Sequence, residues 1–421
     1  MRKDRIDSAT VCIVGLGYVG LPLAQAFARR LKVIAFDIDR KKVKQLNQGH
    51  SHQEPNPRFT SNPKQIGQAD FIIICVPTPV TRSKEPDLSP VENAARTVGQ
   101  HMKRGCVVTL ESTVYPGVTE EIVKPILEEE SGLKCGHDFM IAYSPERMNP
   151  GDAEHSLDRV TKVVAGMNPE VSSLVAELYG KVTPHVFQAK DIKTAEAAKV
   201  IENIQRDLNI ALMNELALIF NKMGLSINDV LEAAATKWNF HRYSPGLVGG
   251  HCIPVDPYYL VYKAKELGYH PQVILAGRAI NDHMPKHVAE LTIKALNQSD
   301  KVIKGSRVLI MGLTYKGNVP DTRETPVKGI IEELREYGIE VFGHDPLLDN
   351  IEPEFGIQVV RQLGEGPKFD GIILAVDHDA FRKLKLKALR RVLNERPILI
   401  DVRQIFDREE AEREGFCYRT L

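Results

Sequence analysis

The chain has 421 residues, of which 43% are hydrophobic and 26% charged, as in globular proteins, and it is too long for one ordinary core. Its 55 basic and 55 acidic side chains balance, so the net charge gives no argument for a nucleic acid or an anionic membrane as a partner. The charged N-terminal segment and the lack of a long apolar run argue against a signal peptide and a membrane span, and therefore predict a cytoplasmic protein.

A glycine-rich motif follows the first predicted strand, Thr10–Val14. The motif Gly15-Leu16-Gly17-Tyr18-Val19-Gly20 leads directly into a helical pattern, which is GxGxxG in the context of a dinucleotide site. The next strand, Lys32–Phe36, ends at Asp37, where an acid would receive the adenosine ribose and favour NAD over NADP, although the nearby Arg40 weakens that preference. The alternative is a glycine-rich turn in some other α/β domain. The residues that we predict to bind NAD here are Gly15, Gly17, Tyr18, Val19, Gly20, Asp37 and Arg40.

Three further predicted strands are each followed by a polar side chain. The strands are Phe71–Val76, Val107–Leu110 and Met140–Tyr143, and the side chains are those of Thr78, Thr113 and Glu146. The carboxyl ends of the strands in a doubly wound sheet form the edge where ligands bind, so we expect these three residues over one face. The alternative is that each residue only caps the end of its strand.

A long amphipathic helix is predicted from Asp191 to Met223, about 45 to 50 Å in length. It is longer than one domain needs, so we expect it to cross between domains and to contribute to a homodimer interface. Lys199 and Asn203 are four residues apart and therefore share one face of this helix. The alternative for this pair is a solvated lysine with an ordinary polar neighbour.

A loop rich in glycine and proline is predicted over Ser244–Leu260, between helical segments at Ile227–Ala235 and Tyr258–Asn297. It contains Cys252 and, four residues later, Asp256, a thiol and a carboxylate that together suit nucleophilic chemistry. The alternative is a tight turn whose cysteine is a small buried hydrophobe. The six cysteines form no CxxC pair and no His/Cys cluster, so we expect neither a disulfide framework nor a metal site.

Strand and helix patterns alternate again after Lys301, which predicts a second parallel α/β domain. Its first strand is followed by Thr314–Asn318 and not by GxGxxG, so we expect a nucleotide held by the cationic side chains of Lys316 and Arg403. The predicted fold is therefore α/β, with two Rossmann-like doubly wound sheets joined by a long central helix and a helical middle domain. The predicted domains are 1–190, 191–298 and 299–421.

Seven motifs together resemble the UDP-glucose/GDP-mannose dehydrogenase family. They are GLGYVG, VPTP, ESTVYPG, YSPER, K-x-x-x-N on the long helix, GGHCIPVDPYYL and DTRETP. The histidine of GGHC, the ATKWNF approach and the long-helix sequence are similar to the N-acetylhexosamine branch, which includes UDP-N-acetylglucosamine 6-dehydrogenases of the Vi-antigen type and UDP-N-acetylgalactosamine dehydrogenases. The UDP-glucose enzymes tend to carry GGSCF instead.

The resemblance implies a four-electron oxidation, in which the C6 hydroxyl of a UDP-N-acetylhexosamine becomes a carboxylate for surface polysaccharides such as capsule or O-antigen, with NAD as the cofactor. It implies that Cys252 forms a thiohemiacetal and then a thioester. It assigns the remaining catalytic roles to Lys199, Asn203, Asp256, Thr113 and Glu146. It adds Thr78, Thr113 and Arg323 on the cofactor side, and on the substrate side Glu146, Arg147, Lys199, Asn203, Arg242, Tyr243, Gly249, Lys316 and Arg403.

One departure from the family pattern leaves the general base open. The UDP-glucose branch has a second glutamate four residues after Glu146, where this chain has Pro150. Arg147, Arg242 and Arg278 are candidates for sugar or diphosphate contacts, and each could instead form a structural salt bridge. The rival readings are the same chemistry on UDP-N-acetylgalactosamine, UDP-N-acetylmannosamine or UDP-glucose, a two-electron β-hydroxyacid-type dehydrogenase, and a non-catalytic nucleotide-sugar sensor.

Overall fold

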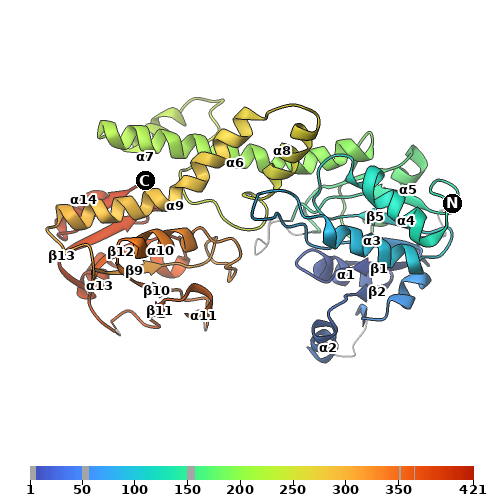
Figure 1. The fold of residues 1–421 in the computed structure, drawn as a ribbon, viewed down its shortest axis with the longest axis horizontal. Coiled ribbons are helices and arrows are strands. Elements are labelled where there is room, and N and C mark those ends of the chain that lie inside the picture. Colours follow the sequence, from blue (N-terminus) through green and yellow to red (C-terminus); the bar gives the residue numbers. More distant parts are fainter. Residues whose placement is uncertain (1–5, 50–55, 149–156, 350–351, 365) are drawn as a thin grey trace. The chain divides into compact units, whose positions relative to one another are not determined.

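A computed structural model describes residues 6–49, 56–148, 157–349, 352–364 and 366–421. The chain forms two compact units, one comprising Met1–Asn203 with Val255–His270 and the other Ile204–Pro254 with Pro271–Leu421. Figure 1 shows that a sheet with helices packed against it forms the body of each unit.

The sheet of the first unit has the strand order β3-β2-β1-β4-β5-β6-β7-β8. Its strands pair in parallel, except that β7 is antiparallel to β6. The strands are β1 (Thr10–Val14), β2 (Lys32–Phe36), β3 (Arg58–Thr60), β4 (Phe71–Ile74), β5 (Val107–Leu110), β6 (Met140–Tyr143), β7 (Lys162–Gly166) and β8 (Val186–Gln188).

Both faces of this sheet are buried, because alternate strand residues point to opposite sides. Cys12 and Val14 of β1 belong to the apolar cluster that contains residues of α3 (Ser89–His101) and α4 (Lys124–Ser131). Val11 and Ile13 belong to the cluster on the other face, with α1 (Gly20–Ala28) and α5 (Pro169–Tyr179). The unit also contains α2 (Arg40–Gly49), the short helices Pro63–Gln68 and Thr119–Val123, and α8 (Asp256–Glu266).

The second unit contains a six-stranded sheet of order β11-β10-β9-β12-β13-β14, with every pairing parallel. The strands are β9 (Arg307–Met311), β10 (Glu340–His344), β11 (Gln358–Val359), β12 (Phe369–Leu374), β13 (Leu393–Asp401) and β14 (Cys417–Thr420). The helices are α7 (Ile227–Ala234), α9 (Gln272–Gln298), α10 (Val327–Glu336), α11 (Glu352–Phe355), α12 (Asp379–Arg382), α13 (Leu386–Arg391) and α14 (Arg408–Arg413).

The predicted long helix is α6, which spans Ile192–Met223 and belongs to the first unit up to Asn203 and to the second unit from Ile204 onward. The predicted α/β class, with two mainly parallel sheets and a long connecting helix, is confirmed. The predicted helical segment over Tyr258–Asn297 comprises two helices, α8 and α9. The chain leaves α8 at Glu266 and re-enters a helix at Gln272, because Gly268 adopts φ +77° and Pro271 stands before the second helix. The division into domains at 190 and 298 stays a prediction.

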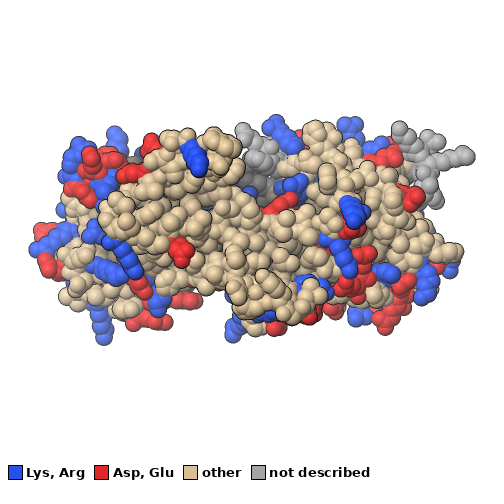
Figure 2. Space-filling view, turned by 90° about the horizontal axis from the view of Figure 1, so that it is seen from above, with Lys and Arg blue, Asp and Glu red and all other residues tan. Residues whose placement is uncertain are grey.

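The surface carries both signs of charge, as the balanced composition requires. Figure 2 shows basic and acidic side chains interspersed on the face in view. In the described part of the chain, no single helix is long and apolar enough to cross a membrane, although α6 and α7 taken together, with a bend of 119° between them, meet the criteria of length and composition.

Candidate active site

The turn between β1 and α1 has the backbone geometry that a bound pyrophosphate requires. Gly15 adopts φ +94°, and a β-carbon on Gly20 would lie 1.9 Å from the carbonyl oxygen of Gly15. A β-carbon on Gly17 would meet no protein atom within 4 Å, so the backbone there is open to a ligand. No acidic residue stands in the first turn of α1, so the positive end of the helix dipole is left to favour an anion. These residues fit the diphosphate of NAD.

Asp37 follows β2 directly and is tied to this turn. Its carboxylate accepts hydrogen bonds from the amide of Leu16 at 2.9 Å and from the amide of Asp39 at 2.9 Å. Burial raises the pKa of Asp37, but these amides and the ammonium of Lys42, 3.2 Å away, outweigh burial and lower it. Lys42 was not predicted, whereas the predicted Arg40 is exposed at the start of α2. Tyr18 is 39% exposed beside the open turn.

Thr78, Thr113 and Glu146 follow β4, β5 and β6, which are neighbours in the sheet, so the predicted adjacency of these strand ends is confirmed. The carbonyl oxygen of Thr78 accepts a hydrogen bond from the hydroxyl of Tyr259, at 2.8 Å, which joins the β4 strand end to α8. Thr113 is half-buried. The roles of these three residues stay predictions.

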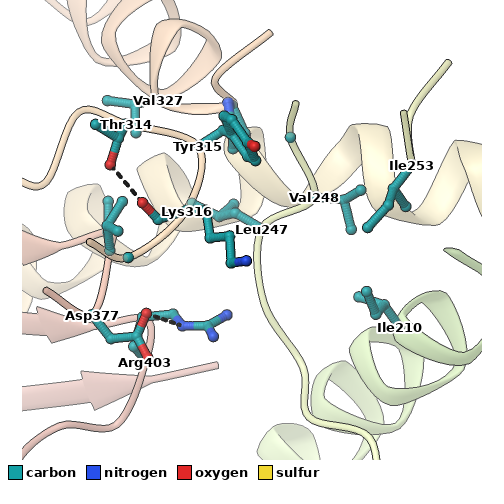
Figure 3. Close-up of a pocket in the computed structure, with 15 residues that line it drawn as sticks. Ile210, Leu247, Val248, Ile253, Thr314, Tyr315, Lys316, Val327, Asp377 and Arg403 are labelled. Carbon is teal, nitrogen blue, oxygen red and sulfur yellow. Dashed lines mark hydrogen bonds and ion pairs between the residues drawn. The ribbon is translucent and has the colours of Figure 1, made fainter. Parts of the chain in front are cut away.

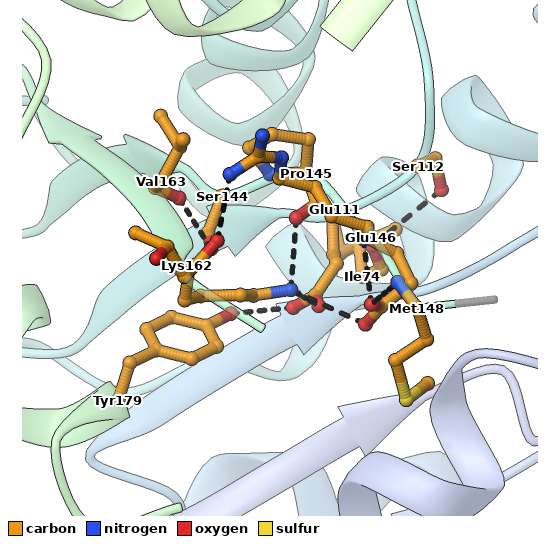
Figure 4. Close-up of polar contacts among 12 residues, drawn as sticks. Ile74, Glu111, Ser112, Ser144, Pro145, Glu146, Met148, Lys162, Val163 and Tyr179 are labelled. Atoms are coloured by element: carbon orange, nitrogen blue, oxygen red, sulfur yellow. Dashed lines mark hydrogen bonds and ion pairs between the residues drawn. The ribbon is translucent and has the colours of Figure 1, made fainter. Parts of the chain in front are cut away.

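Glu146 belongs to a buried ionic cluster that the sequence did not predict (Figure 4). The ammonium of Lys162 donates to Glu111, to the carbonyl oxygen of Pro145 at 2.9 Å and to Glu146 at 3.3 Å, and the hydroxyl of Tyr179 donates to Glu111. Burial raises the pKa of Glu111 to about 7. Burial also raises the pKa of Glu146, but Lys162 and two backbone amides outweigh burial and lower it. Glu146 is therefore held as an ionised acceptor, which makes it a weak base.

Asn203 and Asp256 meet inside the first unit, although they are 53 positions apart in the sequence. The side-chain amide of Asn203 donates to the carboxylate of Asp256 at 2.5 Å, and both side chains are buried. Burial raises the pKa of Asp256 to about 6, and the charge of Lys199 and the hydrogen bond from Asn203 oppose that rise only in part. Lys199 is half-buried one helical turn before Asn203. The arrangement supplies one carboxylate that titrates near neutrality.

Cys252 belongs to the second unit and is exposed. Its loop is anchored at Gly246 by Asn214 of α6, which donates to the Gly246 carbonyl oxygen at 3.0 Å and accepts from the Gly246 amide at 2.8 Å. Asn214 was not predicted. The thiols of Cys12, Cys75 and Cys106 are instead buried in the first unit, and burial raises their pKa values. The alternative reading of Cys252 as a buried hydrophobe is therefore excluded.

The glycines before Cys252 pack on another loop of the same unit. A β-carbon on Gly249 would lie 2.5 Å from the ring of Pro326, and one on Gly250 would lie 2.8 Å from the ring of Tyr315. The amide of Gly250 also donates to the carbonyl oxygen of Glu324 at 3.2 Å. This close approach explains why the loop that carries the thiol is rich in glycine.

A pocket of about 180 Å³ opens between these two loops and the end of the second sheet (Figure 3). The predicted residues Gly249, Lys316 and Arg403 all line it. The guanidinium of Arg403 lies 3.7 Å from the carboxylate of Asp377, a lining residue that was not predicted. Two cationic side chains beside apolar walls can hold a nucleoside diphosphate.

The remaining predicted residues lie elsewhere. Arg147 pairs with Glu202 of α6 at 2.9 Å, and Arg278 is buried against Asp207 at 2.6 Å, which matches the structural alternative for both. Arg323 pairs with Asp321 at 2.6 Å in the second unit. Arg242 is exposed, and the hydroxyl of Tyr243 accepts from Gln205 at 3.1 Å. Pro150 lies outside the described residues.

Three family models match the chain in sequence order. Residues 9–183 match the NAD-binding domain, residues 193–283 the central domain and residues 309–408 the UDP-binding domain of the UDP-glucose/GDP-mannose dehydrogenase family. These matches cover most of both units.

Two curated proteins and one solved structure are similar over nearly the whole chain. The chain is 46% identical to UDP-N-acetyl-D-glucosamine 6-dehydrogenase of Pseudomonas aeruginosa, over 96% of this chain and 98% of that protein. It is 47% identical to Protein CapL of Staphylococcus aureus, over 95% and 97% of the two chains. The structure of UDP-D-ManNAc dehydrogenase from Pyrococcus horikoshii superimposes with a TM-score of 0.87 and 32% identity, over 98% of this chain and 99% of that chain.

Proposed function

The chain belongs to the UDP-glucose/GDP-mannose dehydrogenase family, and on that premise we propose that it is a UDP-N-acetylglucosamine 6-dehydrogenase. The observation that carries this proposal is the exposed thiol of Cys252, in a loop that packs against the wall of a pocket with two cationic side chains. A two-electron alcohol dehydrogenase needs no such thiol, which argues against the β-hydroxyacid-type reading. The identity to a protein named for UDP-N-acetyl-D-glucosamine supports the choice of sugar.

NAD+ bound in the turn from Gly15 to Gly20 supplies the hydride acceptor, one equivalent for each oxidation step. The first hydride and a proton leave the C6 alcohol, which becomes an aldehyde. The thiolate of Cys252 adds to the aldehyde carbon and forms a carbon–sulfur bond, and the resulting thiohemiacetal oxyanion loses the second hydride to become a thioester. Water then cleaves the carbon–sulfur bond and releases the carboxylate and the thiol.

Lys199 and Asn203 are donors, so we assign them to the developing oxyanion or to an ordered water. Asp256 exchanges protons, since its raised pKa lets it accept a proton and release it near neutrality. Thr113 and the ionised Glu146 orient the water, a role that needs an acceptor and no strong base. Lys316 and Arg403 bind the diphosphate of the UDP-sugar, and Arg323 acts on the cofactor side.

Two groups of alternatives stand beside this proposal. The same chemistry on UDP-N-acetylgalactosamine, UDP-N-acetylmannosamine or UDP-glucose would need only a few different hydrogen bonds, each contributing about 1 kcal/mol. The similarity to a structure named for ManNAc favours keeping that epimer in the comparison. A nucleotide-sugar sensor would need no nucleophile, and the retention of Cys252, Lys199, Asn203 and Asp256 disfavours it.

The test is the yield of NADH from a limiting amount of each UDP-sugar, run to completion. We expect about two NADH per UDP-N-acetylglucosamine, and a lower kcat/KM on its epimers and on UDP-glucose. One NADH per sugar would refute the four-electron reaction. Turnover only on another UDP-sugar would move the assignment to that substrate, and UDP binding without NADH formation on any of them would favour the sensor.

The fall of kcat/KM at acid pH, the acid limb of the pH profile, should reflect protonation of Asp256. A carboxyl group with a pKa of about 6 can accept a proton only above that pH, so kcat/KM is expected to fall as the pH drops through about 6. Asp256→Asn should lower kcat and remove this limb. The measurement is kcat/KM from about pH 5 to pH 8 for both proteins, and an unchanged limb in the variant would assign it to another group.

We also propose a homodimer formed through α6. Leu212, Ile219 and Met223, which recur on one face of this helix, are 50%, 47% and 63% exposed. An exposed apolar stripe of this kind favours association with a second copy. The wild type is expected at twice the 47.1 kDa mass of one chain, and the variant with Leu212→Asp and Ile219→Asp at the mass of one chain. Light scattering after gel filtration measures this, with Val302→Asp, at a 78% exposed loop position, as the control that should stay dimeric.

The enzyme is proposed to act in the cytoplasm and to supply a UDP-N-acetylhexosaminuronate for surface polysaccharide such as capsule or O-antigen. The similarity to Protein CapL supports the proposed link to surface polysaccharide.

A further inference from the structure

The two sheets have the same strand order over six strands. The order β11-β10-β9-β12-β13-β14 in the second unit corresponds to β3-β2-β1-β4-β5-β6 in the first. The strands β1 and β9 are each followed directly by a glycine of positive φ, +94° at Gly15 and +89° at Gly312. The amide of each glycine donates at 2.9 Å to the last residue of the neighbouring strand, Phe36 in one sheet and His344 in the other. The second unit therefore contains the counterpart of the dinucleotide turn.

The acidic residue is repeated as well. Asp345 follows β10 as Asp37 follows β2. Asp345 accepts from the amide of Leu313 at 2.8 Å and from that of Leu347 at 2.9 Å, which are the positions that Leu16 and Asp39 occupy around Asp37. The hydrogen bond between the acid and the turn is therefore a property of this fold and is not by itself a sign of a bound cofactor.

The two copies differ in the fourth residue after the strand on the other side of the turn. Thr78 is the fourth residue after β4, and the fourth residue after β12 is His378. His378 is only 1% exposed, and its Nε2 lies 3.1 Å from the carboxylate of Asp345. Burial raises the pKa of Asp345, but the hydrogen bonds from His378 and from the two amides outweigh burial and lower it. The carboxylate of Asp345 is thus bound to a buried imidazole, whereas that of Asp37 pairs with the ammonium of Lys42, which is 37% exposed.

His378 also holds the segment Thr314–Asn318. The amide of Asn318 donates to Nδ1 of His378 at 2.9 Å, which leaves the proton on Nε2 for Asp345, and the hydroxyl of Thr314 lies 3.3 Å from Nε2. This segment belongs to the connection 312–326 between β9 and α10, where the first unit has only 15–19 between β1 and α1. Asn318 adopts φ +61° and its side chain accepts from the amide of Asp379, so the far end of the segment is fixed too.

Lys316 lies in the middle of this fixed segment and lines the pocket with Arg403 (Figure 3). The hydroxyl of Thr314 donates to the carbonyl oxygen of Lys316 at 2.9 Å. A lysine side chain has high conformational freedom, so the backbone that carries it has to be held if the ammonium is to meet a phosphate.

We propose that His378 is a positioning residue, which closes the second dinucleotide turn with the Thr314–Asn318 segment and thereby holds Lys316 toward a nucleoside diphosphate in the pocket. This inference rests on the proposed function only for the identity of the ligand as a UDP group.

The test separates the two hydrogen bonds of the imidazole by substitution. In His378→Asn the side-chain oxygen can replace Nδ1 and still accept from the amide of Asn318, whereas in His378→Gln the amide can replace Nε2 and still donate to Asp345. We expect UDP to bind roughly tenfold more weakly to the glutamine variant and within about twofold of wild type to the asparagine variant. Calorimetric titration of the full-length protein with UDP measures this, and titration with NAD+ should give the wild-type affinity in both variants.

A double-mutant cycle with Lys316→Ala tests whether His378 acts through Lys316. The loss of UDP affinity caused by His378→Gln should largely disappear in the Lys316→Ala background. In the His378→Gln single variant, KM for the UDP-sugar should rise with kcat unchanged. Equal losses of UDP affinity in the wild-type and Lys316→Ala backgrounds, or wild-type UDP affinity in His378→Gln, would overturn the role of His378 and leave the proposed function untouched. Wild-type affinity in Lys316→Ala would overturn the diphosphate assignment of the pocket as well.

A second site guards against a variant at the buried His378 that fails to fold. Asn318 is exposed. Asn318→Ala places an alanine at φ +61°, a value that alanine rarely adopts, and removes the hydrogen bond from the amide of Asp379. UDP affinity should fall in this variant and fall less in Asn318→Gly, which tolerates that φ. Equal UDP affinity in wild type, Asn318→Ala and Asn318→Gly would count against a held segment.

Discussion

Replacing Cys252 with alanine is expected to lower kcat by on the order of 10³-fold or more and to hold the yield at or below one NADH per sugar. The methyl group cannot add to the aldehyde, so the second hydride has no thiohemiacetal from which to leave. Cys252→Ser should retain a small residual rate, since an alkoxide can form the analogous hemiacetal but is harder to generate than a thiolate. The measurement is NADH absorbance with limiting UDP-N-acetylglucosamine.

Two controls make this result specific. Cys417→Ala removes a half-buried thiol in β14 and should give wild-type rates. Calorimetry should give Cys252→Ala the wild-type affinity for UDP, which shows that the pocket is intact. A yield of two NADH from Cys252→Ala, even at a reduced rate, would show that the thioester route is not used.

Replacing Lys162 with methionine should destabilise the first unit by about 3 to 5 kcal/mol. Lys162 is completely buried, and burial lowers its pKa, but Glu111 and Glu146 outweigh burial and raise it. Methionine matches its length but leaves two buried carboxyl groups without a cation. The thermal midpoint of this unit should fall by roughly 10 °C, as measured by calorimetry.

The buried location of Lys162 is what makes this effect large, and two comparisons test that. Lys103, 40% exposed and 2.9 Å from Asp70, is the matched surface pair, and Lys103→Met should cost less than about 1 kcal/mol. Adding Glu111→Gln to Lys162→Met removes one uncompensated charge and should recover part of the loss. Equal midpoints for Lys162→Met and Lys103→Met would refute the importance of the cluster.

The pH dependence of the Lys162→Met deficit has a definite sign. Loss of the cation raises the pKa values of Glu111 and Glu146 in the folded state above their values in the unfolded state. A carboxyl group shifted in this way lowers the free energy of unfolding as the pH rises from its unfolded-state pKa to its folded-state pKa. The deficit should therefore be smaller at about pH 5 than at about pH 7.

Features encoded in a few consecutive residues could be predicted from the sequence. The dinucleotide turn is one, because the three glycines, the strand before them and the helix after them are contiguous. The long helix is another, since its apolar period runs without interruption and the observed range, Ile192–Met223, differs from the predicted start by one residue. The irregular backbone around Cys252 also follows local signals, since glycines and prolines exclude a helix or a central strand, whereas the exposure of Cys252 came from the structure.

Features that join distant positions could not be predicted. The contact of Lys162 with Glu111 spans 51 positions and that of Asn214 with Gly246 spans 32. None of these four residues belongs to a periodic pattern or a spaced motif that would indicate its partner. The break between α8 and α9 did have a local signal, Gly268 and Pro271, which the helical pattern on either side concealed. The correspondence of His378 with Thr78 appears only when the two sheets are compared strand by strand.

The closed turn of the second unit bears on how the reaction is timed. The described residues contain one turn of the GxGxxG type, from Gly15 to Gly20, while its counterpart after β9 continues into the Thr314–Asn318 segment that is bonded to His378. A reaction that consumes two NAD+ per sugar must then use the same turn twice, with one cofactor exchanged for another between the two oxidations. The half-oxidised sugar has to stay on the protein throughout that exchange. Its rate of escape, compared with the rate of cofactor exchange, then decides whether any free aldehyde reaches the solution.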